Sequence, residues 1–70
     1  MPSPVPFRTV RKQLEQAGWY LDRTNGSHHI FKREGRRTFT IPVHQNKVRW
    51  VYAKQVEKEL RREAEDQGGA

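Results

Sequence analysis

The 70-residue sequence contains no cysteine, and this absence excludes several kinds of site. Disulfide bonds, thiolate nucleophiles and cysteine-ligated zinc all need that side chain. Long hydrophobic runs are also missing, so the N-terminal segment fits neither a signal peptide nor a membrane span. We therefore expect a cytoplasmic protein that makes no contact with a membrane.

The length of the chain limits its architecture to one domain, residues 1–70. A domain this small buries only about 60% of the surface that its unfolded chain exposes, so its core must be thin. We expect the folded part to cover approximately residues 6–64 and both ends to fray.

Acidic side chains are scarce over most of the chain. Residues 1–54 carry eleven Lys and Arg side chains against three acids, and the whole sequence has a net charge of +6. A basic body of this kind is typical of proteins that bind polyanions, most simply nucleic acid. The alternative is that small soluble domains are often basic without having such a partner.

Apolar residues at helical spacing predict two helices. A helix over residues 6–17 is indicated by a stripe of Phe7, Val10, Leu14 and Ala17. Pro6 suits the first turn of this helix, and Gly18 suits the left-handed residue that follows the last turn. A second stripe predicts a helix from about residue 49, through Ala53, Val56, Leu60 and Ala64.

Between the helices we predict strands at residues 19–24, 28–33 and 37–43. Asn25-Gly26 is the strongest two-residue hairpin signal, because a type I′ turn needs positive φ at both positions. Glu34-Gly35 predicts the second turn, and Pro42 should end the third strand or lie at a sheet edge. Residues 44–47 form a polar connector. The predicted fold is α+β, in the order α-β-β-β-α, with both helices on one face of a three-stranded antiparallel sheet.

Turns of two residues would also fix the register of the sheet. Leu21 would then face Ile30, and Arg23 would face His28. The side chains expected to pack against the helices are Trp19, Leu21, Ile30, Phe39 and Ile41. The opposite face would carry Tyr20, Asp22, His29, Phe31, Thr38 and Thr40. Because a one-residue slip would mix apolar and polar side chains, the sequence favours this register.

The same register places like charges opposite each other at the second turn. Lys32 would lie across from Arg37, and Arg33 across from Arg36. Such pairs destabilise a ladder. They indicate either a site for an anionic ligand or an exposed tip where solvent screens the repulsion.

Three histidines, His28, His29 and His44, are the candidates for chemistry. Adjacent strand residues point to opposite faces, so His28 and His29 cannot bind one metal ion, and we predict neither a metal site nor a cofactor. The sequence has no Ser paired with both a His and an acid, no phosphate-binding glycine-rich loop and no carboxylate cluster for magnesium. Acid–base chemistry by an imidazole remains.

RNA is a substrate on which one imidazole can act, because its 2′-hydroxyl attacks the adjacent phosphorus once a base removes the proton. His28 is the candidate base. Cationic side chains that could hold phosphates are Arg23, Lys32, Arg33, Arg36 and Arg37. The alternative is that His28 is a hydrogen-bonded residue at the rim of the core. His29 is expected to contact RNA or a partner from the outer face, where Tyr20 and Phe31 either stack a base or form a plain cross-strand pair.

Several short motifs share their order and spacing with a known family. They are a helix ending in Ala17-Gly18-Trp19, then Arg23, then Gly26-Ser27-His28-His29-Ile30-Phe31, and then Ile41-Pro42-Val43-His44. Over approximately residues 7–60 the chain resembles the HicA toxins of bacterial type II toxin–antitoxin systems. The resemblance implies a fold like the double-stranded-RNA-binding domain and a metal-independent ribonuclease that cleaves mRNA. It also implies inhibition by a HicB-type antitoxin that covers the active site.

The catalytic histidine that this resemblance implies is His28, the first histidine after Gly26 and Ser27, which would set its position. Residues 47–52 are bulkier and more aromatic than is typical of the family at the start of the second helix. The alternative function is a non-catalytic RNA-binding module of the same fold, which would need no particular histidine.

Overall fold

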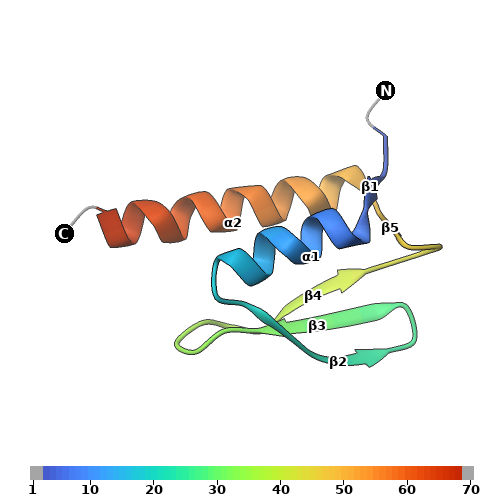
Figure 1. The fold of residues 1–70 in the computed structure, drawn as a ribbon, viewed down its shortest axis with the longest axis horizontal. Coiled ribbons are helices and arrows are strands. Elements are labelled where there is room, and N and C mark those ends of the chain that lie inside the picture. Colours follow the sequence, from blue (N-terminus) through green and yellow to red (C-terminus); the bar gives the residue numbers. More distant parts are fainter. Residues whose placement is uncertain (1–2, 69–70) are drawn as a thin grey trace.

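The computed structural model describes residues 3–68, and its two helices lie on the same side of an antiparallel sheet (Figure 1). The main elements are α1 (Phe7–Gln16), β2 (Tyr20–Asn25), β3 (His28–Lys32), β4 (Phe39–Pro42) and α2 (Trp50–Gly68). The sheet order is β2-β3-β4, which confirms the predicted α-β-β-β-α arrangement. The predicted fraying of the ends falls partly on Met1, Pro2, Gly69 and Ala70, which lie outside the described residues.

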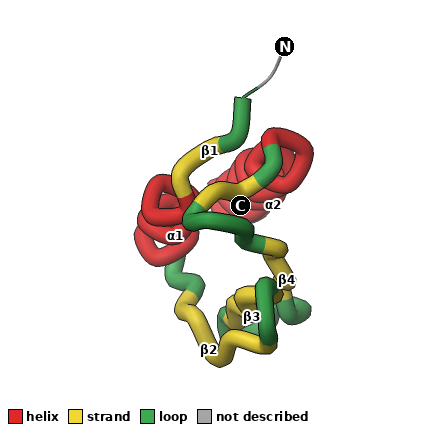
Figure 2. The backbone as a smooth tube through the Cα atoms, turned by 90° about the vertical axis from the view of Figure 1, so that its right-hand side faces the viewer, coloured by secondary structure: helices red, strands yellow, loops and turns green. Residues whose placement is uncertain are grey.

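The core lies between the helices and one face of the sheet. Figure 2 shows both helices on that side of the sheet. The buried residues of the core are Val10, Leu14, Trp19, Phe31, Ile41, Val43, Val48, Ala53 and Val56. Phe7 and Ala17 pack against this cluster, so the predicted apolar stripe of the first helix is confirmed. Burial of a Val, Leu, Ile or Phe side chain contributes about 1.5–3 kcal/mol, which makes this cluster the main stabilising term.

Gly18 ends α1 as predicted. Its φ is +95°, and its N–H donates to the carbonyl of Glu15 at 3.0 Å. The N–H of Trp19 donates to the carbonyl of Leu14 at 2.9 Å. These two bonds form a Schellman motif, which turns the chain from the helix into β2.

The turn between β2 and β3 is shifted by one residue from the prediction. Gly26 and Ser27 form it, in place of Asn25 and Gly26. Gly26 has a φ of +61°, whereas Ser27 is not left-handed, a pattern typical of a type II′ turn with glycine in the first position. The observed pairs are therefore Leu21 with Phe31, Arg23 with Ile30, Asn25 with His28, His29 with Ile41, and His28 with Pro42.

This shift exchanges the two faces of β3. The covered face, which packs on the helices, carries Leu21, Thr24, His29, Phe31, Phe39 and Ile41. The open face carries Tyr20, Arg23, Asn25, His28, Ile30, Lys32, Thr40 and Pro42. Ile30 is buried, at 9% exposed, but it lies on the open face and outside the core cluster, so the prediction that it packs on the helices is wrong. The predictions that Phe31 and His29 lie on the outer face are also wrong. An irregularity in the ladder between Leu21 and Arg23 absorbs one residue, so Leu21 keeps its predicted face.

The connection between β3 and β4 is longer than predicted and covers residues 33–38. The N–H of Arg36 donates to the carbonyl of Arg33 at 3.0 Å, and Gly35 has a φ of +79°. The expected cross-strand pairs of Lys32 with Arg37 and of Arg33 with Arg36 are therefore absent from the described sheet, and that prediction is wrong. Pro42 does end the edge strand β4, as predicted.

Residues 44–47 form a second tight hairpin in place of the predicted connector. Gln45 and Asn46 have φ values of 52° and 63°, as a type I′ turn requires. His44 and Lys47 exchange backbone hydrogen bonds of 3.0 and 2.8 Å across it. The turn brings β5 (Lys47–Val48) beside β1 (Val5–Pro6), a pairing that the sequence did not predict.

Candidate functional site

His28 is the first residue of β3 and lies on the open face, directly after the Gly26-Ser27 turn. It is exposed, and its neighbours across the two ladders are Asn25 and Pro42. Within residues 3–68, none of the side-chain hydrogen bonds involves its ring. His28 is therefore not a hydrogen-bonded residue of the core rim.

His29 has the opposite environment. It is half-buried on the covered face, where its ring lies 4.6 Å from that of Phe7 at a tilt of 55°. Its Nδ1 is 3.3 Å from the carbonyl oxygen of Ser27. The expectation that His29 reaches solvent from the outer face is wrong, because the register points it at α1.

The Gly26-Ser27 turn is fastened to the neighbouring strand segment through its backbone. The carbonyl oxygen of Ser27 accepts the N–H of Val43 at 2.7 Å, in addition to its contact with His29. Gly26 supplies the positive φ, and space around it is open. The backbone at His28 is therefore fixed on two sides, by its pairing with β2 and by the hydrogen bond from Val43 at the end of β4.

Two of the predicted cations share the open face with His28. Arg23 and Lys32 both pair with Asp22, at 2.8 and 3.6 Å. Arg23 lies diagonally across the ladder from His28. Lys32 is four residues further along β3, about 13 Å away at about 3.3 Å per residue. Both pairs are largely exposed, so they are weak and exchangeable.

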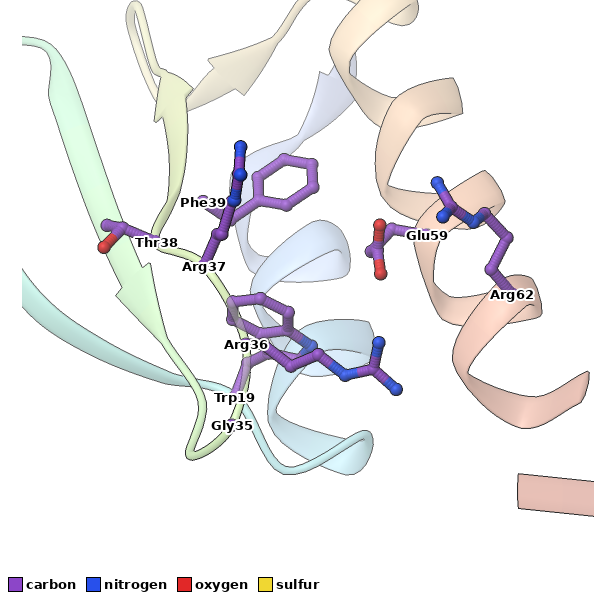
Figure 3. A pocket seen from close by; sticks show the side chains of 8 residues that line it. All are labelled: Trp19, Gly35, Arg36, Arg37, Thr38, Phe39, Glu59 and Arg62. Carbon is purple, nitrogen blue, oxygen red and sulfur yellow. The ribbon is translucent and has the colours of Figure 1, made fainter. Parts of the chain in front are cut away.

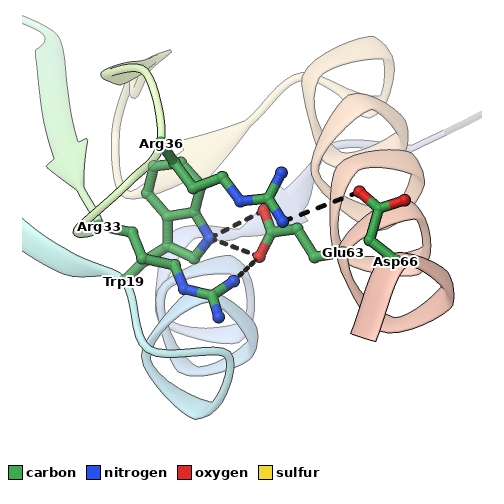
Figure 4. A network of polar contacts seen from close by, with 5 residues as sticks. All are labelled: Trp19, Arg33, Arg36, Glu63 and Asp66. Carbon is green, nitrogen blue, oxygen red and sulfur yellow. Dashed lines mark hydrogen bonds and ion pairs between the residues drawn. The ribbon is translucent and has the colours of Figure 1, made fainter. Parts of the chain in front are cut away.

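Arg33 and Arg36 instead turn toward α2 (Figure 4). Arg33 forms an ion pair with Glu63, and Arg36 lies 3.8 Å from Asp66. Glu63 is only 3% exposed, and both of its carboxylate oxygens also lie 3.2 Å from Nε1 of Trp19, which donates to them. The buried carboxylate is thus neutralised and hydrogen-bonded, as burial of a charge requires.

Arg37 belongs to the same end of the molecule. With Arg36 and Arg62 it lines a pocket between the β3–β4 connection and α2, above Trp19 and Phe39 (Figure 3). Figure 1 places this connection at the opposite end of the sheet from the Gly26-Ser27 turn. The sequence predicted one basic site, whereas the structure separates Arg23 and Lys32 on the open face from Arg36 and Arg37 beside α2.

Residues 7–62 match the family model of the HicA toxin of bacterial toxin–antitoxin systems. The chain belongs to the HicA toxin family. It is accordingly the toxin of a toxin–antitoxin pair, and an antitoxin is its partner. No curated protein and no solved structure matches the chain, so the likeness to double-stranded-RNA-binding domains stays a prediction.

The two motifs of the HicA toxin resemblance meet in the fold. His28 of the first motif pairs with Pro42 of the second, and Ser27 accepts the N–H of Val43. Segments about fifteen residues apart in the sequence thus build one end of the open face. The alternation of side chains along β3 puts the first histidine of the motif on the open face and the second against α1.

Among the described residues, no three His, Asp or Glu side chains gather where they could hold a metal ion. In the same residues no helix combines the length and the apolar character needed to cross a bilayer.

The sequence missed the contacts of Glu63. The apolar stripe of residues 53, 56 and 60 can continue at either Glu63 or Ala64, because both lie at helical spacing from residue 60. We predicted Ala64 as the buried residue because it is the more hydrophobic of the two. In the structure Glu63 is buried and Ala64 is exposed. The signal that could have found it is the presence of two donors without an assigned acceptor, the indole of Trp19 and the guanidinium of Arg33.

Proposed function

We propose that this toxin is an endoribonuclease that cleaves mRNA in the cytoplasm without a metal ion, and that His28 is its general base. The observation that carries the proposal is the exposed position of His28, whose ring is free of hydrogen bonds to the described residues and which lies on the face that neither α1 nor α2 covers. An imidazole in that setting can accept a proton near neutral pH.

The proposed step begins when a ring nitrogen of His28 removes the proton of an RNA 2′-hydroxyl. The oxygen attacks the adjacent phosphorus, the bond to the 5′-oxygen of the next nucleotide breaks, and a 2′,3′-cyclic phosphate remains. The leaving 5′-oxygen takes a proton from water. Gly26 and Ser27 set the position of the base through the turn, and a positioned base contributes roughly 10²- to 10⁴-fold to the rate.

We propose different roles for the cations. Arg23 lies diagonal to His28, which supports a role in holding a phosphate close to the cleaved bond. Lys32 would bind a phosphate further along the RNA strand. Arg36 and Arg37 lie at the far end of the sheet and act by attracting RNA through the field of the basic surface.

We assign the open face also to the antitoxin partner, which we propose to be of the HicB type. A protein bound over His28 would exclude RNA from the only face of the three-stranded sheet that the described helices leave uncovered. Inhibition then needs no change in the fold of the toxin.

The proposal is tested by incubating the purified protein with RNA in EDTA and analysing fragment lengths and ends. Wild-type protein should give fragments that end in a 2′,3′-cyclic phosphate. His28→Ala should lose cleavage by at least roughly 10²-fold, with an unchanged unfolding transition. His44→Ala, which removes an exposed histidine from another hairpin, should cleave normally. Full cleavage by His28→Ala would reject the role of His28.

A matched substrate separates catalysis from binding. RNA with a single 2′-deoxynucleotide at a mapped cleavage position should be bound but not cut there, because the attacking oxygen is missing. A gel shift without any cleavage of unmodified RNA would favour the non-catalytic RNA-binding module.

A further inference from the structure

We infer that Tyr20 forms a subsite that stacks an unpaired RNA base at a distance from the cleaved bond, an inference that rests on the proposed ribonuclease function. Tyr20 is 54% exposed, the highest value among the large exposed hydrophobic residues of the described chain. It lies on the open face, directly opposite Lys32. Aromatic side chains beside cations are the usual platform for single-stranded nucleic acid.

The ring of Tyr20 has no aromatic neighbour among the described residues, because the observed register puts its expected partner, Phe31, on the covered face. Phe31 is fully buried on the covered face and pairs with Leu21. The aromatic contacts of the described residues involve Phe7, His29, Phe31, Trp19 and Phe39, and none includes Tyr20. Its exposed ring is therefore not explained by packing.

A hollow beside the ring offers the phosphate of a nucleotide one available cation, Lys32, because Arg33 and Arg36 pair with Glu63 and Asp66. Tyr20 lines it together with Lys32, Arg33, Glu34, Arg36 and Thr38, and its volume is about 520 Å³. Lys32 reaches only Asp22, at 3.6 Å, in an exposed pair that a phosphate can replace. A base on the ring of Tyr20 thus has a cation beside it for its phosphate.

The spacing along β3 decides which nucleotide this is. His28 and Lys32 lie on one face of the strand, about 13 Å apart at about 3.3 Å per residue. Because Tyr20 faces Lys32, a base stacked on it cannot belong to the nucleotide whose 2′-hydroxyl His28 would deprotonate. The subsite therefore takes a base further along a single strand that follows β3, and bases in a duplex cannot reach the ring.

Binding is measured first, with RNA oligonucleotides and the His28→Ala protein, so that no cleavage occurs. Tyr20→Ala should weaken binding of an unpaired octanucleotide by about fivefold to 150-fold, the range for loss of one base-stacking aromatic ring. Tyr20→Phe, which keeps the ring, should bind like the parent.

Trp50 provides the matched control. It is also exposed, at 43%, and also lies beside a lysine, with Nζ of Lys54 at 5.5 Å from its ring. It begins α2, on the other side of the sheet from the open face (Figure 1). Trp50→Ala should leave octanucleotide binding unchanged, so an equal loss in both variants would overturn the inference.

An abasic scan of the same octanucleotide locates the stacked base. At one position, removal of the base should weaken binding to the His28→Ala protein. The same removal should not weaken binding to the variant that also carries Tyr20→Ala, because that variant has already lost the stacking interaction. Additive losses at every position would overturn the inference. If the protein binds RNA and the scan shows this coupling but no variant ever cleaves, the subsite stands and the nuclease proposal fails. If the protein binds no RNA, both fail.

Discussion

The two faces of the sheet use the same residue type for different purposes. His29, on the covered face, packs on Phe7 and approaches the carbonyl oxygen of Ser27. His28, one residue earlier, points to solvent and contacts no hydrogen-bonding group among the described residues. The alternation of a strand, and nothing in the side chains themselves, separates the two roles. We therefore expect changes on the covered side to alter stability and changes on the open side to alter RNA binding and cleavage.

Removal of the buried carboxylate should give the largest loss of stability. Glu63→Ala leaves Trp19 Nε1 without its acceptor and Arg33 without its partner. Breaking a buried pair costs about 3–5 kcal/mol, and the partial exposure of Arg33 lowers this to about 2–4 kcal/mol of the free energy of unfolding, as measured by urea titration. Cleavage per folded molecule should be retained.

Glu65→Ala is the control for this change, because Glu65 is an exposed acid on the same helix. It should change the free energy of unfolding by less than about 0.5 kcal/mol. Equal effects of the two substitutions would show that the network of Figure 4 does not stabilise the covered side.

A smaller loss is expected at the end of α1. Gly18→Ala places a methyl group in a left-handed conformation and 3.3 Å from Nε of Arg33. We expect the free energy of unfolding to fall by about 1–2 kcal/mol. Gly35→Ala has a similar φ of +79° but no atom within 4 Å, so it should lose less. A larger loss at Gly35 in the same titration would contradict this explanation.

The sequence predicted the helices and their buried faces well because those depend on local spacing. Val10 and Leu14 are fully buried, and Gly18 ends α1 in the left-handed conformation. The register was predicted wrongly because Asn25-Gly26 and Gly26-Ser27 are both acceptable two-residue turns. Burial of Phe31 in the core decides between them, and that depends on how β3 packs on both helices.

Ion pairs between residues far apart in the chain could not be predicted from the sequence. Arg33 and Arg36 looked like a repulsive cluster because their partners, Glu63 and Asp66, are thirty residues away. Gln45-Asn46 was not recognised as a turn because glutamine rarely adopts positive φ. The choice of His28 as the candidate base rested on the Gly26-Ser27-His28 motif. It was therefore unaffected by the error in the register.

The most direct test of the account compares His28→Ala with His29→Ala in two assays, RNA cleavage and urea unfolding. We predict that His28→Ala loses cleavage and keeps its stability. His29→Ala should lose about 1–2 kcal/mol of the free energy of unfolding, because it gives up its packing on Phe7 and its contact with Ser27, and it should still cleave RNA when folded. The reverse pattern, with cleavage lost in His29→Ala and stability lost in His28→Ala, would contradict the assignment of the open face as the reactive one.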